Sequence, residues 1–116
     1  MTDNVIVTKT YSFAVRVVKF CIEMQDKKKE YVLSRQLLKS GTSIGANTEE
    51  SQGAISKAEF IAKIQIALKE AKETKYWLRL IKDSAVYQNA HSEQLLNDCN
   101  EIILIITSIL KTAKSK

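Results

Sequence analysis

Apolar residues recur every three or four positions through most of the chain, the spacing of one face of an α-helix. Short polar stretches separate four such segments, which predict helices over residues 9–25, 31–54, 57–87 and 92–113. Thr8 or Thr10 would cap the first helix, and Ser56 with Glu59 matches a capping box before the third. Residues 5–7 precede the first helix as a short arm or strand. Because short connections favour antiparallel neighbours, we predict an all-α, up-and-down antiparallel four-helix bundle in one domain, residues 1–116.

The third and fourth predicted helices carry clear core stripes. The third has apolar or small residues at Phe60, Ile64, Ala67, Ala71, Thr74, Leu78, Ile81 and Ala85. The fourth has them at Leu95, Leu96, Cys99, Ile102, Ile103, Ile106, Ile109 and Leu110. We expect these positions to face the bundle core.

The second predicted helix is richer in small and polar residues, with a seam at Leu33, Leu37, Ser40, Ile44, Asn47, Ser51 and Ala54. Gly41 and Gly45, four residues apart, would allow a neighbouring backbone to approach closely. Glycine costs a helix roughly 1 kcal/mol relative to alanine, so a kink or break is the alternative to the continuous helix that we favour. Asn47 would be a buried amide that fixes helix register, with Glu50 as its companion in a polar cluster.

Several helices carry more apolar residues than one bundle seam needs. The first has two neighbouring stripes: Tyr11, Ala14, Val18, Cys21 and Gln25, and Phe13, Val17, Phe20 and Met24. Single exposed hydrophobic residues are ordinary, whereas soluble monomers seldom expose contiguous stripes. We therefore expect a homo-oligomer whose interface includes Phe13, Phe20, Ile66, Trp77, Leu80, Leu104 and Ile105.

The charge balance adds a possible partner. Eighteen basic residues stand against 13 acidic ones, giving a formal charge of +5 that is compatible with a polyanionic partner. On the third predicted helix the bases Lys69, Lys72, Lys75, Arg79 and Lys82 share one broad arc, and Glu59, Glu70 and Glu73 lie roughly opposite. A solvated face laced with ion pairs is the plain interpretation. The functional interpretations are a nucleic-acid-binding strip or a complementary contact between subunits. Further bases that would extend such a strip in an assembly are Arg16, Lys19, Arg35 and Lys39.

Known catalytic constellations are missing from the sequence. The chain has no phosphate-binding glycine motif and no ExxH repeat, and its single histidine, His91, falls in a predicted polar turn. Cys21 and Cys99 lie on apolar helix faces, where we expect buried, reduced thiols. We therefore predict no enzymatic activity, no metal and no cofactor. Without a secretory signal or a membrane-spanning apolar run, we expect a cytoplasmic protein.

A specific combination of residues runs from Leu33 to Leu80. It comprises Leu33-Ser34-Arg35-Gln36-Leu37, Lys39-Ser40, Ser43-Ile44, Asn47, Glu50, Gly53, Phe60, Ala67, Lys69-Glu70-Ala71, Glu73-Thr74 and Trp77-Leu78. In these residues the chain resembles the four-helix-bundle family of 23S rRNA intervening-sequence proteins, first noticed inside intervening sequences of bacterial large-subunit ribosomal RNA genes. Thr48 and Glu49 depart from the family pattern, which usually has an apolar and then a small residue after the asparagine.

The resemblance implies an up-and-down bundle that assembles into a barrel-like homopentamer. It also implies kinship with the accessory variability determinant protein of diversity-generating retroelements, a basic protein that binds nucleic acid and a reverse transcriptase. The partners it suggests are therefore a second copy of the chain, RNA or DNA and, if the gene belongs to a retroelement, a reverse transcriptase. Most family members have no established activity.

Overall fold

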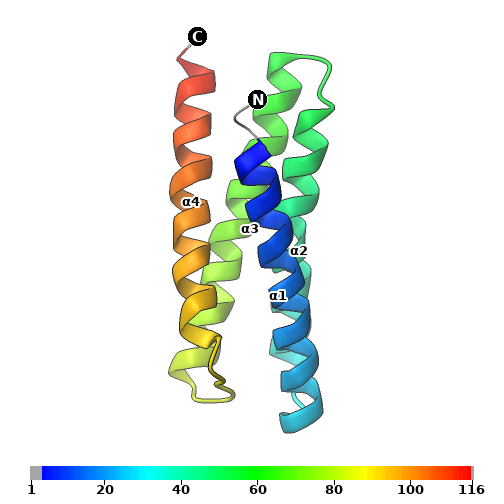
Figure 1. Cartoon of the computed structure of the whole chain (residues 1–116), viewed down its shortest axis with the longest axis vertical. Coiled ribbons are helices and arrows are strands. Elements are labelled where there is room, and N and C mark those ends of the chain that lie inside the picture. The colour runs from blue at the N-terminus through cyan, green and yellow to red at the C-terminus, as the bar shows by residue number, and fades with distance from the viewer. Residues whose placement is uncertain (1–3, 116) are drawn as a thin grey trace.

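Four long helices run up and down beside one another in the computed structural model, which describes residues 4–115 (Figure 1). They are α1 (Asn4–Lys28), α2 (Val32–Gln52), α3 (Lys57–Asp83) and α4 (Ser92–Lys114), and they form a bundle of 47 × 20 × 20 Å. Among the described residues there is no strand. Helix α1 packs against α2 and α4, and α3 packs against the same two, so α1 and α3 stand on one diagonal. The predicted all-α four-helix bundle is confirmed.

Helix α1 begins earlier than its sequence suggests. Residues 5–7 are helical instead of forming an arm or strand, and Ile6 is buried in the core. Thr10 is not a cap: it lies inside the helix, fully buried, and its hydroxyl donates to the carbonyl of Ile6 at 2.8 Å. A threonine hydroxyl satisfied in this way by its own helix is compatible with burial.

Helix α3 ends four residues before the predicted boundary. Its last residue is Asp83, and Ala85 has a positive φ of 57°, which turns the chain out of the helix. Ala85 is therefore exposed and does not extend the α3 seam. The turn brings Tyr87 back onto α1, where its ring packs against Phe20 with centroids 5.3 Å apart.

Helix α2 is continuous through its two glycines, as expected. A Cβ at Gly41 would lie 2.8 Å from Cγ1 of Val17, and one at Gly45 would lie 3.2 Å from the carbonyl oxygen of Thr10. Both glycines thus face α1 and permit close approach of the two helices. The capping box before α3 also forms: Ser56 Oγ accepts from the Glu59 amide at 3.0 Å. The Glu59 carboxylate accepts a hydrogen bond from the amide of Ile55 at 2.9 Å, whereas a capping box uses the amide of the cap residue, here Ser56.

The core contains the central α3 and α4 stripes predicted from the sequence. Ile64, Ala67, Ala71, Thr74, Leu78 and Ile81 are buried on α3, and Leu95, Cys99, Ile102, Ile106 and Leu110 on α4. Phe13 and Phe20 require a correction. Assigned above to an oligomer interface, they are 0% and 4% exposed within a single chain, because their stripe is the core face of α1.

Asn47 also requires a correction, because it is half-buried and not on the α2 seam. Its Nδ2 donates to the Ser43 carbonyl of its own helix at 2.9 Å. The buried polar residues at this level are Thr48 and Ser51, whose hydroxyls donate to carbonyls one turn earlier. Glu50 is exposed and pairs with Lys63 on α3 at 2.7 Å, so it is no companion of Asn47.

Candidate nucleic-acid interface

Five basic residues on α3 form what we call the basic strip: Lys69, Lys72, Lys75, Arg79 and Lys82. All are exposed except Lys75, which is half-buried beside α4. Lys82 pairs with Glu93 of α4 at 3.5 Å. Among the described residues, the other four have no carboxylate within ion-pair distance. Within residues 4–115, four cationic groups of the basic strip are therefore not neutralised by an ion pair.

The acidic residues Glu59, Glu70 and Glu73 form what we call the acidic flank of α3. This flank faces α2, since Lys63 pairs across the seam with Glu50 and Thr74 donates to Ser40 at 3.0 Å. The hydrogen bond and charge of Glu50 raise the pKa of Lys63. Glu73 accepts a hydrogen bond from the Trp77 indole at 3.2 Å. Glu59 and Glu73 thus accept hydrogen bonds from nearby residues, whereas the basic strip consists mostly of cations without an ion-pair partner among the described residues.

The remaining predicted bases are not brought to this strip. Arg16 on α1 pairs with Asp98 of α4 at 2.5 Å and lies over the Phe13 ring, 5.8 Å from its centroid. Lys19 is exposed on the same helix, and Arg35 and Lys39 are exposed on α2. Because α1 is diagonal to α3, a single chain presents Arg16 and Lys19 on a different face from the basic strip.

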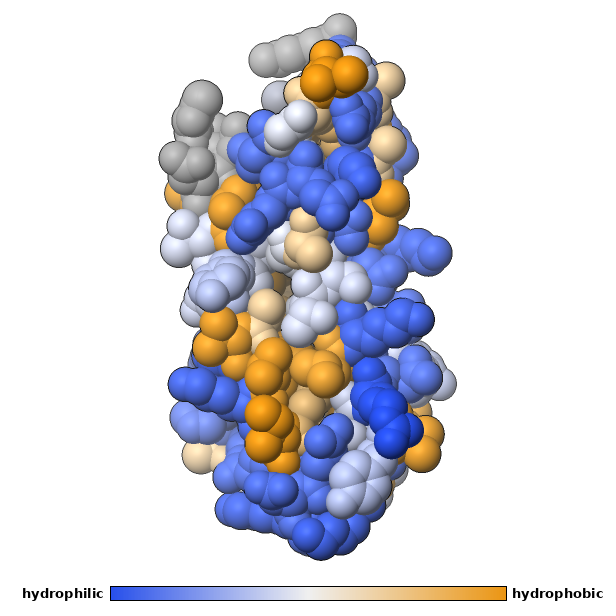
Figure 2. All heavy atoms as spheres, turned by 90° about the vertical axis from the view of Figure 1, so that its right-hand side faces the viewer, coloured by the Kyte–Doolittle hydropathy of each residue, from blue (hydrophilic) through white to orange (hydrophobic). Residues whose placement is uncertain are grey.

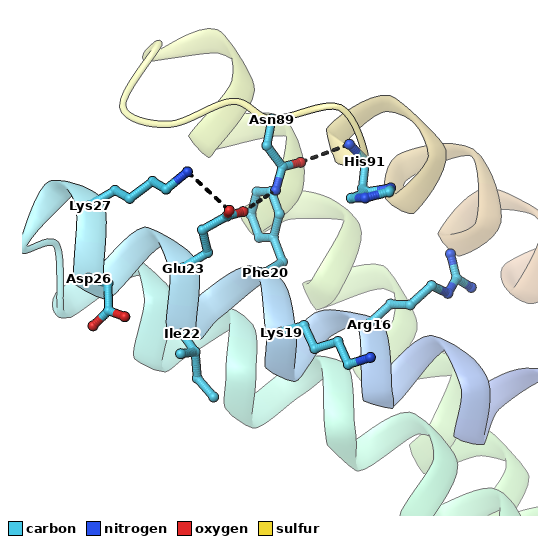
Figure 3. A pocket seen from close by; sticks show the side chains of 9 residues that line it. All are labelled: Arg16, Lys19, Phe20, Ile22, Glu23, Asp26, Lys27, Asn89 and His91. Atoms are coloured by element: carbon cyan, nitrogen blue, oxygen red, sulfur yellow. Dashed lines mark hydrogen bonds and ion pairs between the residues drawn. The ribbon is translucent and has the colours of Figure 1, made fainter.

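A cleft of about 650 Å³ opens between α1 and the connection that leads into α4 (Figure 3). Its lining combines Phe20 and Ile22 with Arg16, Lys19, Glu23, Asp26, Lys27, Asn89 and His91. Figure 3 shows Lys27 and Asn89 converging on Glu23, while Arg16 and Lys19 extend from α1 on the side where His91 leads into α4. The cleft is therefore amphipathic, and sequence reasoning missed it because its residues come from segments more than sixty positions apart.

Glu23 of α1 accepts hydrogen bonds from the connection between α3 and α4. Hydrogen bonds from Tyr87, Asn89 and Lys27, in order of importance, lower the pKa of its carboxyl to about 2. The Asn89 amide donates at 2.5 Å, and Lys27 lies 3.2 Å away on the next turn of α1. Burial of Tyr87, with its hydrogen bond to Glu23, raises the pKa of the Tyr87 hydroxyl. At neutral pH, Glu23 is thus an ionised anchor with its acceptor capacity largely occupied.

The two thiols are buried and belong neither to the basic strip nor to the lining of the cleft. Cys21 and Cys99 are buried as expected, and burial raises the pKa of each to about 12. The Cys99 thiol donates to the Ala71 carbonyl at 3.3 Å. A thiol is nucleophilic only as its thiolate, so neither is activated at neutral pH. No three His, Cys, Asp or Glu side chains gather to hold a metal ion within residues 4–115.

Helix α1 carries an exposed apolar face that was not assigned correctly from the sequence. Tyr11, Val15 and Ile22 are exposed on α1, and Val18 is half-buried between them. Apolar side chains gather in the lower half of the α1–α2 side of the molecule, bordered by hydrophilic ones (Figure 2). Of the other residues assigned to an interface, Leu104 is 71% exposed, Ile66 and Leu80 are exposed, and Trp77 and Ile105 are half-buried against the core.

Comparisons with known proteins agree with the fold. A sequence model of the family described as "23S rRNA-intervening sequence protein" matches residues 2–108. The chain is 46% identical to a crystallised protein of unknown function from the S23 ribosomal protein family of Bacteroides thetaiotaomicron. That match covers 96% of this chain and 99% of the other, with a TM-score of 0.90. No curated protein sequence matches the chain. Within residues 4–115, none of the helices combines the length and hydropathy that a membrane span requires.

Proposed function

The chain belongs to the 23S rRNA-intervening sequence protein family, and we propose that it is a non-enzymatic accessory protein that binds the backbone of RNA or DNA as a homo-oligomer. The observation that carries this proposal is the basic strip, where Lys69, Lys72 and Arg79 are exposed and unpaired among the described residues. Unpaired cations on one helical face attract the regularly spaced charges of a phosphate backbone.

Lysine predominates in the basic strip, which bears on the mode of binding. An ammonium group contacts phosphate as a point charge, without the bidentate base recognition that arginine provides. Binding is therefore weakly sequence-specific and driven by the release of counterions. The expected slope of log affinity against log salt is roughly −0.9 per neutralised phosphate on duplex DNA and −0.7 on single strands.

Assembly would strengthen a weak individual strip. The exposed apolar face of α1 and the exposed Leu104 supply surface for self-association, and five copies is the number that the resemblance implies. Repetition of the strip around a ring raises avidity without any new contact. Assembly would also carry Arg16, Lys19, Arg35 and Lys39 toward strips of other copies. A reverse transcriptase is a further partner if the gene belongs to a retroelement.

The proposal is tested by binding of RNA and DNA across a salt series. The variant replaces Lys69, Lys72 and Arg79 together by glutamine, and it is expected to weaken binding and flatten the salt slope by about 2 to 3 units on duplex DNA. A matched control replaces Lys28, Lys111 and Lys114, which are exposed outside the strip, so that the net charge falls equally. The control should retain most of the affinity and slope.

The alternative is a protein–protein scaffold without a nucleic-acid role. The exposed apolar face of α1 favours it, since such faces commonly mark interaction sites. If the wild-type oligomer binds neither RNA nor DNA at low salt, this alternative replaces the proposal. Equal losses in the strip variant and the control would attribute binding to overall charge and would contradict the assigned strip.

A further inference from the structure

An aromatic ring stands within the basic strip. Tyr76 lies seven residues after Lys69 and three before Arg79, so Lys69, Lys72, Tyr76 and Arg79 follow the alternating three/four spacing of one helical face. Tyr76 is 53% exposed, so a large part of the residue is accessible to a ligand. One helical face thus presents three cations and one accessible ring.

The Tyr76 ring is supported by its neighbour. It meets the Trp77 ring edge to face, with centroids 5.0 Å apart and an interplanar angle of 74°. Trp77 is itself held, because its ring packs against the core and its indole donates to Glu73. A ring that is supported on one edge and exposed elsewhere loses little freedom on binding a planar ligand.

We propose that Tyr76 is a base-stacking residue and that the basic strip therefore prefers single-stranded nucleic acid to duplex. This inference rests on the proposed function. Lys69, Lys72 and Arg79 would hold the phosphates while an unstacked base lies on the Tyr76 ring. In a duplex the base faces are covered by their neighbours, so the ring contributes only where the strand is single.

The surroundings set the extent of this site. Asp83 continues the same helical face beyond Arg79, and its exposed carboxylate would repel a phosphate. Toward the N-terminus the face continues through the neutral Gln65. The site therefore spans Lys69 to Arg79, about 15 Å of helix at 1.5 Å per residue, which suits a few nucleotides per chain.

The experiment compares the full chain with three variants on a single-stranded RNA of roughly 16 nucleotides and on a duplex RNA of the same length. Tyr76→Leu removes the ring but keeps an apolar side chain. Tyr76→Phe keeps the ring as the matched control, and Lys72→Gln removes one phosphate contact. We expect Tyr76→Leu to weaken single-strand binding roughly 5- to 100-fold with an unchanged salt slope, and to leave duplex binding unaffected. Tyr76→Phe should bind as wild type, whereas Lys72→Gln should lower affinity for both RNAs and flatten the slope.

The outcomes separate this inference from the proposed function. Wild-type binding that is insensitive to Tyr76→Leu would overturn the stacking role and leave the proposed function standing. If Tyr76→Leu lost equal affinity for both RNAs, the stacking role would also be overturned. A smaller oligomer of Tyr76→Leu in light scattering would overturn it too, because the ring would then serve assembly with a second copy. Circular dichroism and the behaviour of Tyr76→Phe control for folding. If the wild type binds neither RNA at low salt, the proposed function itself fails.

Discussion

The two seams of α1 are built by different means. Against α2 the helix makes extensive apolar contact, with Gly41 facing Val17 and Gly45 facing the Thr10 carbonyl, so that the backbones approach closely. Against α4 it packs less extensively, and polar groups bridge the seam: Arg16 to Asp98, Lys9 to Glu101 and, at the connection, Glu23 to Asn89.

The difference shows how one helix can pack closely on one side and border an open cleft on the other. Small residues leave no space between α1 and α2, so that seam depends on packing, which is sensitive to a single added methyl group. Long polar side chains hold α1 and α4 together at the surface, and a cleft of about 650 Å³ opens beside them. We therefore expect substitutions in the first seam to change stability more than substitutions in the second.

The largest effect is expected at Gly41. Gly41→Ala places a methyl group 2.8 Å from Val17, which is fully buried and stiff at χ1. Overpacking costs roughly 1–3 kcal/mol, partly offset by roughly 1 kcal/mol of better helix propensity, so a net loss of up to about 2 kcal/mol is expected in urea unfolding.

Two variants sharpen this test. Gly53→Ala is the matched control, because the nearest atom to its new Cβ lies 3.8 Å away and the residue has no positive φ. It should change stability by less than about 0.5 kcal/mol. Combining Gly41→Ala with Val17→Ala should recover part of the loss, since the added methyl enters the space that valine leaves. Strict additivity of the two changes would contradict the close packing of this seam.

A smaller effect is expected from the pair Arg16–Asp98 across the second seam. The Asp98 side chain is 17% exposed, so this pair is better shielded than Lys9–Glu101, in which the glutamate side chain is 55% exposed. A double-mutant cycle with Arg16→Gln and Asp98→Asn should give a coupling energy of about 1 kcal/mol. The same cycle at Lys9 and Glu101 should give a coupling near zero. Equal coupling at the two pairs would show that burial of the seam does not strengthen its ion pairs.

The smallest effect concerns Glu23; it is present near neutral pH and is lost in acid. Its pKa falls from 4.5 to about 2 on folding, so its contribution to stability is complete above the unfolded value and is lost as the pH falls toward 2. Glu23→Gln should therefore be less stable than wild type at about pH 6, and the difference should shrink by about pH 3, as measured by urea unfolding. Asp26→Asn, at an exposed position of the same helix, is the control. A constant difference across this range would show that the Glu23 charge contributes nothing to docking of the connection.

Some parts of the candidate site depend on residues close together in the sequence, and others depend on residues far apart. The basic strip lies within one helix, so its spacing along the chain was enough to predict which bases share a face. Tyr76 follows the same spacing, but its exposure and its support by Trp77 depend on how α3 is rotated in the bundle. The cleft joins Glu23 to Asn89, 66 positions away, and no periodic pattern records such a contact.

The sequence by itself determined the four helices, the central core stripes of α3 and α4, the cap at Ser56 and the sorted charges of α3. These features repeat at helical spacing or lie within a few residues, so local physics specifies them. Only the tertiary structure decided how the two apolar stripes of α1 divide between core and surface, because both have the same period. The division depends on packing: Val17 is buried against Gly41 of α2 and Cys21 of the other stripe is buried as well, while Tyr11 of that stripe stays exposed. The same rotation places Thr48 in the core where Asn47 was expected, since adjacent helical positions differ by about 100° and only packing selects between them.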